Sequence, residues 1–392
     1  MPGDEKIIRT KKGKGFNKGN FFVTGSIDIP FLAITIALLT IGLIMLFSAS
    51  YPYAYYNRNH DSYYFFTRQF IFAVAGLAAM FIMSKINYRW LKVATIPLLA
   101  VTILLLIIVL FYHTDFGDFK RWIPLFGGIT FQPSDLAKFT IILTLASYIS
   151  DYYGQMKKFT YGICFPLGVI AVFCGLIYLE HHMSCTILMF LIGATLMFVG
   201  GSDWKLFAFG LGVVILVIIM VIAFPDLLEN YAGDRVKAWL DKDFSPDDKR
   251  WQTNNSLYAI GSGGLFGVGL GNSKQKYLYV SEPQNDFIFS IVCEELGFIG
   301  AAAIILLFAA LVVRGFIIAS RCHDKFGSLL VIGVTAQIGV QVGLNILVVT
   351  DSIPNTGIAL PFFSYGGTAI LMLLFQVGVV LSVSRKSSQK KV

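Results

Sequence analysis

Charged residues are scarce in this sequence. Asp, Glu, Lys and Arg make up only 14% of the 392 residues, whereas 56% are hydrophobic and the mean hydropathy is +0.70. Soluble domains carry about a quarter charged residues, so this composition excludes an ordinary soluble domain. The polar and apolar alternation that marks membrane strands is also missing. A backbone that crosses a bilayer must satisfy its own hydrogen bonds, which leaves helices.

Cysteine is also rare. The chain has five cysteines and no CxxC pair, and none falls in a segment predicted to face the outside. Cys164, Cys174, Cys185 and Cys293 lie inside apolar blocks, and Cys322 lies in a predicted inner loop. Neither a disulfide framework nor a zinc site is therefore expected.

Long apolar runs, in contrast, fill the chain. They come in blocks of about 20 residues, the length at which a helix spans a bilayer. The sequence thus predicts an all-α polytopic membrane protein of about ten transmembrane helices. These helices are expected near residues 30–50, 69–86, 90–112, 134–151, 159–179, 184–200, 204–224, 286–314, 325–349 and 364–384.

Basic residues predict the orientation. Six of the 31 Lys and Arg residues lie within residues 1–29 and four within residues 385–392, so both termini are predicted to be cytoplasmic. The transmembrane domain then spans residues 30–384 between two basic tails. It includes a large extracellular loop at 225–285, between helices seven and eight. Membrane-flanking residues and anionic headgroups explain the net charge of +8, so no nucleic-acid partner is expected.

The predicted outer segment 118–139 places polar residues at the start of helix four. Pro133 and Ser134 favour a helix start, with Ser134 as the N-cap. Asp135 and Lys138 are three residues apart and share one helix face. Asp135 either offsets the helix dipole or lines a cavity. Lys138 either extends its ammonium to the outer interface or faces a partner inside the bundle.

Two further outer segments carry glycine and proline. Residues 259–276 hold five glycines between positions 261 and 269, but no strand precedes them and no Walker pattern fits. These glycines predict tight turns and close helix packing rather than a nucleotide site. Residues 345–369 contain two prolines and no basic residue. This segment either re-enters the membrane region beside a pocket or forms an ordinary tight loop.

Three acids stand at the start of helix eight. Asp286 is the last polar residue before an apolar run, where an aspartate N-cap is common. Glu294 lies about 12 Å deeper, at about 1.5 Å rise per residue, and Glu295 follows it. A glutamate inside a membrane helix indicates a functional site unless a nearby Lys or Arg pairs with it.

The acids and the outward-facing cations together suit an anionic amphiphile. Pyrophosphate binds Arg and Lys, and a polyprenyl chain binds apolar helix faces. An accessible carboxylate such as Asp286 suits a general base that deprotonates a sugar hydroxyl. Transfer without a second, nucleophilic carboxylate would be a direct displacement that inverts the anomeric centre. Transport of the same lipid fits these residue types as well.

Two motifs are specific to one family. They are EPQNDFIFSIVCEELG at 282–297 and IPNTGIALPFFSYGGTA at 353–369, supported by FQPSDLAK at 131–138 and AIGSGGLFGVGLGNSKQK at 259–276. With these motifs, residues 28–385 resemble the SEDS family (shape, elongation, division and sporulation) of FtsW, RodA and SpoVE. The motifs lean toward the FtsW and SpoVE branch.

The resemblance implies a peptidoglycan glycosyltransferase on the outer face of the bacterial cytoplasmic (inner) membrane. Such enzymes polymerise lipid II and release undecaprenyl pyrophosphate in cell division or cell-shape maintenance. The essential acid of the family maps onto Asp286, while Asp135, Glu294 and Glu295 match cavity-lining or structural positions. The matching substrate-binding candidates are Arg68, Arg121, Lys138, Gln275, Lys276, Ser364 and Tyr365.

The resemblance also implies partners and a cofactor. A class B penicillin-binding protein is the expected transpeptidase partner, docked through helices eight and nine, with other divisome or elongasome membrane proteins nearby. Small residues at 297 and 300–303 would permit close helix contact there. A divalent cation, Mg or Mn, is expected with unknown ligands. Two alternatives remain open: a flippase or transporter of lipid-linked precursors, and a non-catalytic scaffold of the division or elongation complex.

Some positions depart from the family pattern. Asp135 stands where the family usually has glutamate, and Gln284 stands where a histidine often precedes the catalytic acid. The acid-Pro-Asp turn between helices five and six is replaced by EHHMSC at 180–185. His181 and His182 there either sense pH or touch substrate, or they are local solvated polarity.

Overall fold

The prediction of a mostly helical membrane protein is confirmed. The computed structural model describes residues 21–111, 121–124, 130–205 and 250–388, together with scattered positions between 207 and 240. Within these residues, seven helices are long and apolar enough to cross a membrane. The predicted helix at 204–224 lies largely outside the described residues, as does the first part of the predicted loop at 225–285.

The described helices follow the predicted order. The first six are α1 (Ile29–Asn57), α2 (Tyr64–Lys85), α3 (Arg89–Phe111), α4 (Pro133–Tyr152), α5 (Phe165–Leu179) and α6 (Met183–Val199). The later ones are α9 (Trp251–Gly263), α10 (Ile288–Arg321), α11 (Lys325–Val349) and α12 (Gly367–Ser388). A short strand pair, β1 (Ile123–Pro124) with β2 (Thr130–Phe131), precedes α4. A 3-10 helix (Tyr153–Gln155) and a π-helix (Thr160–Cys164) link α4 to α5.

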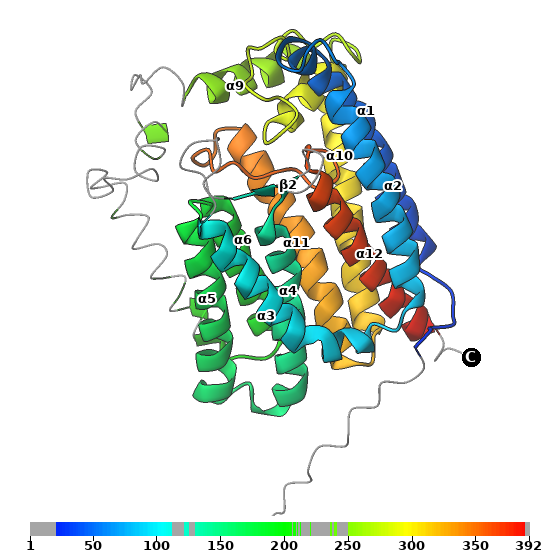
Figure 1. Ribbon diagram of the computed structural model, residues 1–392, viewed down its shortest axis with the longest axis vertical. Coiled ribbons are helices and arrows are strands. Elements are labelled where there is room, and N and C mark those ends of the chain that lie inside the picture. Colours follow the sequence, from blue (N-terminus) through cyan, green and yellow to red (C-terminus); the bar gives the residue numbers. More distant parts are fainter. Residues whose placement is uncertain are drawn as a thin grey trace, which may run out of the picture.

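The helices form one bundle with α11 near its centre. α1, α2, α10 and α12 lie on one side of α11, and α3 to α6 lie on the other (Figure 1). α11 contacts α4, α6, α10 and α12, and most of its residues are buried. α9 lies across the end of the bundle where α10 begins, and the C-terminus lies at the opposite end (Figure 1).

A polar cap fixes the start of α1. Asp28 Oδ1 accepts a hydrogen bond from the Phe31 amide at 3.0 Å, and Pro30 occupies the first turn, where its missing N–H leaves nothing unpaired. The Asp28 carboxylate also binds Arg314 of α10 through Nε and Nη2, both at 2.9 Å. The first membrane helix is thereby tied to the second half of α10.

α10 is broken at Gly297, which the sequence prediction of a continuous helix over 286–314 missed. Gly297 has φ 66° and ψ −171°, a conformation open almost only to glycine. The glycine-rich segment after α9 packs into this break. The amides of Val268 and Gly269 donate to the carbonyls of Glu294 and Glu295 at 2.9 and 3.1 Å. The prediction that these glycines permit tight turns and close packing is therefore confirmed.

Replacing Gly297 with alanine is expected to destabilise the fold by about 2–3 kcal/mol, because the strained backbone and the steric clash add. A Cβ at this position would lie 2.2 Å from the Gly267 amide nitrogen. Gly261→Ala is the matched control, since a Cβ there meets nothing within 4 Å. Thermal unfolding in detergent measures both. Equal melting temperatures for the two variants would contradict this account of the break.

Residues 353–366, between α11 and α12, fold back into the bundle. Ile358, Leu360 and Phe363 are buried, and a Cβ added to Gly42 of α1 would lie 2.3 Å from the Phe362 carbonyl oxygen. The re-entrant alternative is thus confirmed over an ordinary tight loop. α12 consequently begins at Gly367, three residues later than predicted.

Candidate active site

Asp286 lies just outside α10, with Phe287 in the N-cap position between it and the helix. The alternative that Asp286 is a plain N-cap is therefore wrong by one residue. Its side chain is half-buried. Asn345 of α11 donates through Nδ2 to the Asp286 carbonyl at 2.7 Å and to the Ile358 carbonyl at 2.7 Å. One buried amide therefore joins the segment that carries the acid to the re-entrant segment.

The re-entrant segment holds the residues before Asp286 at two more points. The Ser364 hydroxyl donates to the Asn285 carbonyl at 2.8 Å, and the Tyr365 amide donates to the Gln284 carbonyl at 2.8 Å. The Leu360 amide in turn donates to Ser364 Oγ at 2.7 Å. Ser364 is only 8% exposed, so its hydroxyl serves the fold. The two family motifs thus meet in space and fix the backbone around one carboxylate.

Gly357 brings backbone close to that carboxylate. Its φ is +70°, and a Cβ added there would lie 3.1 Å from Asp286 Oδ2. The glycine therefore leaves room beside the acid that a side chain would narrow. Asn355 Oδ1 accepts the Gly357 amide at 3.1 Å and supports this turn. The sequence reasoning did not single out Gly357 or Asn345; their places in the tertiary structure identify them.

Arg68 of α2 lies beside the Tyr365 side chain. Its guanidinium stacks over the Tyr64 ring at 4.2 Å and interacts with the Tyr365 side chain. Burial raises the pKa of the Tyr365 phenol, and the Arg68 charge opposes that rise. The Tyr365 ring also packs edge-on against Phe65 at 4.9 Å. The structure therefore joins the predicted candidates Arg68, Ser364 and Tyr365 to the segment that carries Asp286.

The predicted pairing of Asp135 with Lys138 is present. Lys138 Nζ lies 2.7 Å from Asp135 Oδ1, so this lysine faces a partner inside the bundle. The prediction of Ser134 as N-cap is wrong: α4 begins at Pro133 and Gln132 holds the cap position. A proline's fixed φ and missing N–H suit the first helical position, which moves the start of the helix one residue earlier.

A small cavity of about 50 Å³ connects this ion pair to the re-entrant segment. Asp135, Lys138, Ser364 and Tyr365 all line it. Gln337 of α11 and Gln376 of α12 line it too; Oε1 of each, like Asp135 Oδ2, makes no hydrogen bond to a described residue. The volume admits a few water molecules and is far below the roughly 300 Å³ of small-molecule sites.

Arg121 contacts the turn between α5 and α6. Its Nη2 donates to the His181 carbonyl, and Gln132 Nε2 lies 3.4 Å from His182 Nδ1. His181 is exposed but His182 is half-buried. The alternative that these histidines are merely solvated polar residues therefore fits only His181. Burial, with Arg121 and Lys138 adding to it, holds the pKa of His182 well below its usual value. At neutral pH His182 is therefore an uncharged neighbour of these cations.

Glu180 is a residue that sequence reasoning missed. Its side chain is fully buried, and neither carboxylate oxygen makes a hydrogen bond to a described residue. Burial raises the pKa of Glu180 to about 8, against the opposing effect of the Arg121 charge. An acid directly after the apolar run of α5 was the available signal.

The Glu180→Gln variant is expected to gain stability over the wild type as pH rises. The folded pKa of about 8 exceeds the ordinary value of 4.5, so the folded state holds a proton that the unfolded state has lost. Wild-type stability therefore falls between about pH 4.5 and 8, by up to a few kcal/mol, and glutamine removes that loss. Thermal unfolding of both proteins at pH 5 and pH 9 measures the effect. Parallel pH curves would contradict it.

Glu295 is the centre of a buried ion-pair network. Lys276 Nζ lies 2.9 Å from Glu295 Oε1, and the Ser48 hydroxyl donates to Oε1 and Oε2 at 2.7 and 2.8 Å. Lys276 also donates to the Gly271 carbonyl at 2.6 Å. Lys276 and Glu295 are 3% and 1% exposed. This glutamate therefore has the nearby lysine that makes a structural role sufficient.

Glu294 closes the neighbouring turn. Its carboxylate accepts the Ser273 hydroxyl, and the amides of Lys274 and Gln275 donate to it at 2.9 and 3.4 Å. The side-chain oxygen of Gln275 is buried and makes no hydrogen bond to a described residue. The two glutamates thus hold the loop before Tyr277 against the break in α10.

The expected divalent cation stays a prediction. Among the described residues, no three or more His, Cys, Asp or Glu side chains cluster in a way that could hold a metal ion. The described residues therefore do not form a metal site from protein side chains alone.

Fold and site together define a multi-pass membrane protein that fixes one carboxylate at the end of a helical bundle. The chain belongs to the FtsW, RodA and SpoVE family of cell cycle proteins, whose model matches residues 30–389. It is 38% identical over 364 residues to Stage V sporulation protein E of Bacillus subtilis (strain 168), covering 92% of this chain and 97% of that protein.

Two further similarities point the same way. Identity to a probable peptidoglycan glycosyltransferase FtsW of Trichlorobacter lovleyi is 35% over 360 residues, covering 91% of this chain and 93% of that protein. This chain also superposes on a solved chain with a TM-score of 0.76 at 25% identity. That chain comes from work on the structural coordination of polymerization and crosslinking by a peptidoglycan synthase complex. That match covers 93% of this chain and 99% of the solved one.

Proposed function

We propose that this protein is a peptidoglycan glycosyltransferase that polymerises lipid II in cell division or cell-shape maintenance. The observation that carries the proposal is the fixing of Asp286 by two family motifs distant in sequence. Its relatives include a probable peptidoglycan glycosyltransferase, and the chain matches a component of a peptidoglycan synthase complex. We place it in the bacterial cytoplasmic membrane, with Asp286 facing outside, because the basic tails favour cytoplasmic termini.

Asp286 acts in this mechanism as the general base. It accepts the proton of a sugar hydroxyl on one lipid II molecule, and the oxygen attacks the anomeric carbon of another. The bond from that carbon to the pyrophosphate breaks, and undecaprenyl pyrophosphate leaves with the electron pair. The single displacement inverts the anomeric centre, so no covalent sugar–enzyme intermediate forms.

The surrounding cations divide into two groups: Arg68 is placed to contact the substrate, and the other three are held by residues of the chain itself. Arg68 borders the Tyr365 segment and is half-buried, which suits it to contact the pyrophosphate. Arg121 holds the α5–α6 turn through the His181 carbonyl. Lys138 is paired with Asp135, and Lys276 is paired with Glu295. We assign Lys276 a structural role, which departs from the sequence-based expectation of substrate contact.

We further propose that a class B penicillin-binding protein docks on the exposed side of α10. Phe298, Leu306 and Val313 are exposed on this helix at 68, 68 and 57%. α11, which corresponds to the predicted helix nine, is mostly buried. It therefore contributes less to the docking surface than the sequence suggested. Gly297 does not serve the interface, since it packs against Gly267 within the chain. Ala302 and Ala303 lie at partly or fully exposed positions and stay in the proposed interface.

The test is reconstitution of the purified chain with its class B transpeptidase partner, lipid II and a divalent cation. Glycan polymer on a gel supports the proposal. Absence of polymer, together with lipid II flipping in proteoliposomes, would replace it with the carrier alternative. Absence of both activities would favour the scaffold alternative.

A further inference from the structure

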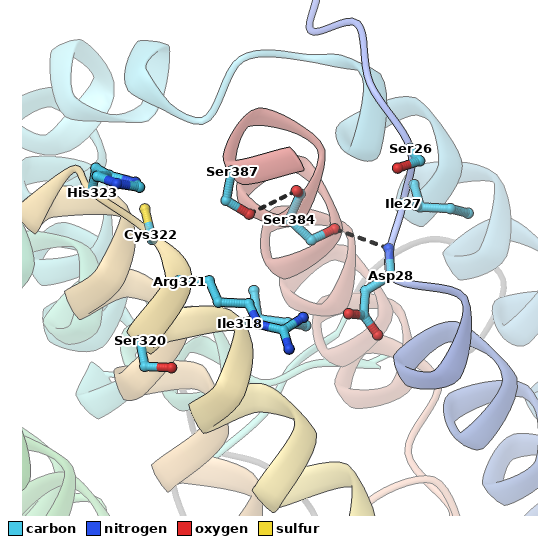
Figure 2. A pocket seen from close by; sticks show the side chains of 10 residues that line it. All are labelled: Ser26, Ile27, Asp28, Ile318, Ser320, Arg321, Cys322, His323, Ser384 and Ser387. Atoms are coloured by element: carbon cyan, nitrogen blue, oxygen red, sulfur yellow. Dashed lines mark hydrogen bonds between the residues drawn. The ribbon is translucent and has the colours of Figure 1, made fainter. Parts of the chain in front are cut away.

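A second cavity lies at the end of the bundle opposite Asp286. It measures about 390 Å³ and forms where α1 begins and where α10 and α12 end (Figure 2). Asp286 precedes the first residue of α10, whereas Arg321 is the last residue of that helix and lines this cavity. The length of α10 therefore separates this cavity from Asp286.

The carboxylate in the cavity wall is already neutralised. Asp28 accepts the Phe31 amide and forms a bidentate pair with Arg314 at 2.9 Å through both nitrogens. Its own amide donates to Ser384 Oγ at 3.2 Å. A paired carboxylate of this kind has little charge left for a cationic ligand. The wall therefore does not select for a cation.

Arg321, whose guanidinium is always protonated, supplies the remaining charge. Figure 2 shows the Arg321 side chain extending from α10 between α12 and the start of α1. No hydrogen bond or ion pair joins its guanidinium to another residue in the described part of the chain. Three serine hydroxyls of the wall are used within the fold: those of Ser320, Ser384 and Ser387 donate to the carbonyls of Ile317, Leu381 and Ser384. Recognition therefore rests on the guanidinium.

The surroundings add positive charge. Arg385, in the last turn of α12, donates to the Gly25 carbonyl at 3.0 Å, and its Nε is buried without a hydrogen bond to a described residue. Asp324 nearby is occupied by Arg89 at 3.5 Å and by the Tyr88 hydroxyl at 2.9 Å. The charge balance at this end therefore favours an anion.

We propose that this cavity binds the phosphate of an anionic phospholipid headgroup. Its volume falls within the roughly 300–1,000 Å³ typical of ligand sites. Ile27, Ile318 and Cys322 give it an apolar wall beside the basic rim, which suits an amphiphile better than a fully hydrated ion. Basic pockets between helix ends on the cytoplasmic side, where the basic tails predict this end to lie, meet anionic headgroups. A free phosphate shares this chemistry, so the test separates the two sources.

The test is native mass spectrometry of the delipidated full chain in detergent with phosphatidylglycerol or phosphatidylcholine added. The wild type is expected to bind phosphatidylglycerol about fivefold more tightly than Arg321→Gln, since one basic residue at the membrane surface contributes about 1 kcal/mol. Lys325→Gln is the matched control. That lysine lies over the Tyr153 ring at 4.2 Å and does not line the cavity.

Each alternative result overturns part of the proposal. Equal phosphatidylglycerol binding by wild type and Arg321→Gln would overturn the site itself. Equal retention of phosphatidylcholine would show apolar packing without phosphate recognition by charge. Displacement of phosphatidylglycerol by inorganic phosphate, with thermal stabilisation of lipid-free protein, would retain the anion site and overturn its lipid source. Binding is read without polymerisation, so failure here leaves the proposed function untouched.

Discussion

Replacing Asp286 with asparagine is expected to lower the polymerisation rate about 10²- to 10⁴-fold, the range that a positioned general base contributes. Asparagine keeps the size of the side chain but cannot accept the hydroxyl proton. The backbone contacts from Asn345 and Ser364 do not involve the changed group, so the fold should persist. Glycan polymer from lipid II, followed by gel with the transpeptidase partner present, measures the rate.

Glu282→Gln is the matched control for Asp286. Glu282 is an exposed carboxylate four residues earlier, hydrogen-bonded by Tyr53 at 3.2 Å and Asn285 at 2.8 Å. This variant should keep near-wild-type activity. Both proteins should also keep the wild-type melting temperature and partner binding. Equal polymer from Asp286→Asn and wild type would refute the assignment of the base.

Replacing Lys276 with methionine is expected to cost about 3–5 kcal/mol of stability, because it leaves the Glu295 charge buried without its counter-ion. Ser48 and the Ser273 amide would remain as hydrogen-bond donors to that carboxylate, but neither carries charge. The melting temperature in detergent should fall sharply. Adding Glu295→Gln to the same protein should recover much of the loss, since the uncompensated charge is then gone.

Lys274→Met is the matched control for Lys276. Lys274 is exposed two residues earlier, so its replacement should change stability by less than about 0.5 kcal/mol. A Lys276→Met protein with wild-type stability and a raised KM for lipid II would instead support the sequence-based expectation of substrate contact.

Much of the fold followed from local pattern. Apolar runs of membrane-spanning length predicted the described helices, since hydropathy and backbone hydrogen bonding act within a single segment. Boundaries were less predictable, because they depend on tertiary contacts. α12 starts at Gly367 since Ser364 and Tyr365 are held by residues 284 and 285, far away in sequence. The break at Gly297 depends on backbone from residues 265–269 entering the helix.

The candidate site, like the fold, was predictable from the sequence only in part. Residue types and motifs identified Asp286, and i,i+3 spacing alone identified the Asp135–Lys138 pair. Spacing could not show that Lys276 lies against Glu295, nineteen residues later, because that contact needs the loop to fold onto the helix. Asn345 and Gly357 gained significance only from what surrounds them, whereas Glu180 also had a local signal, its place directly after the apolar run of α5.

By itself, the sequence determined that this protein is a bundle of membrane helices with basic tails and an acid at the threshold of one helix. Hydrophobicity and charge act on each segment separately, so composition and order sufficed. The tertiary structure decided the surroundings of each acid, because burial and partners arise only when distant segments meet. Glu295 is neutralised by Lys276, whereas Asp286 is held at a half-buried position through its backbone.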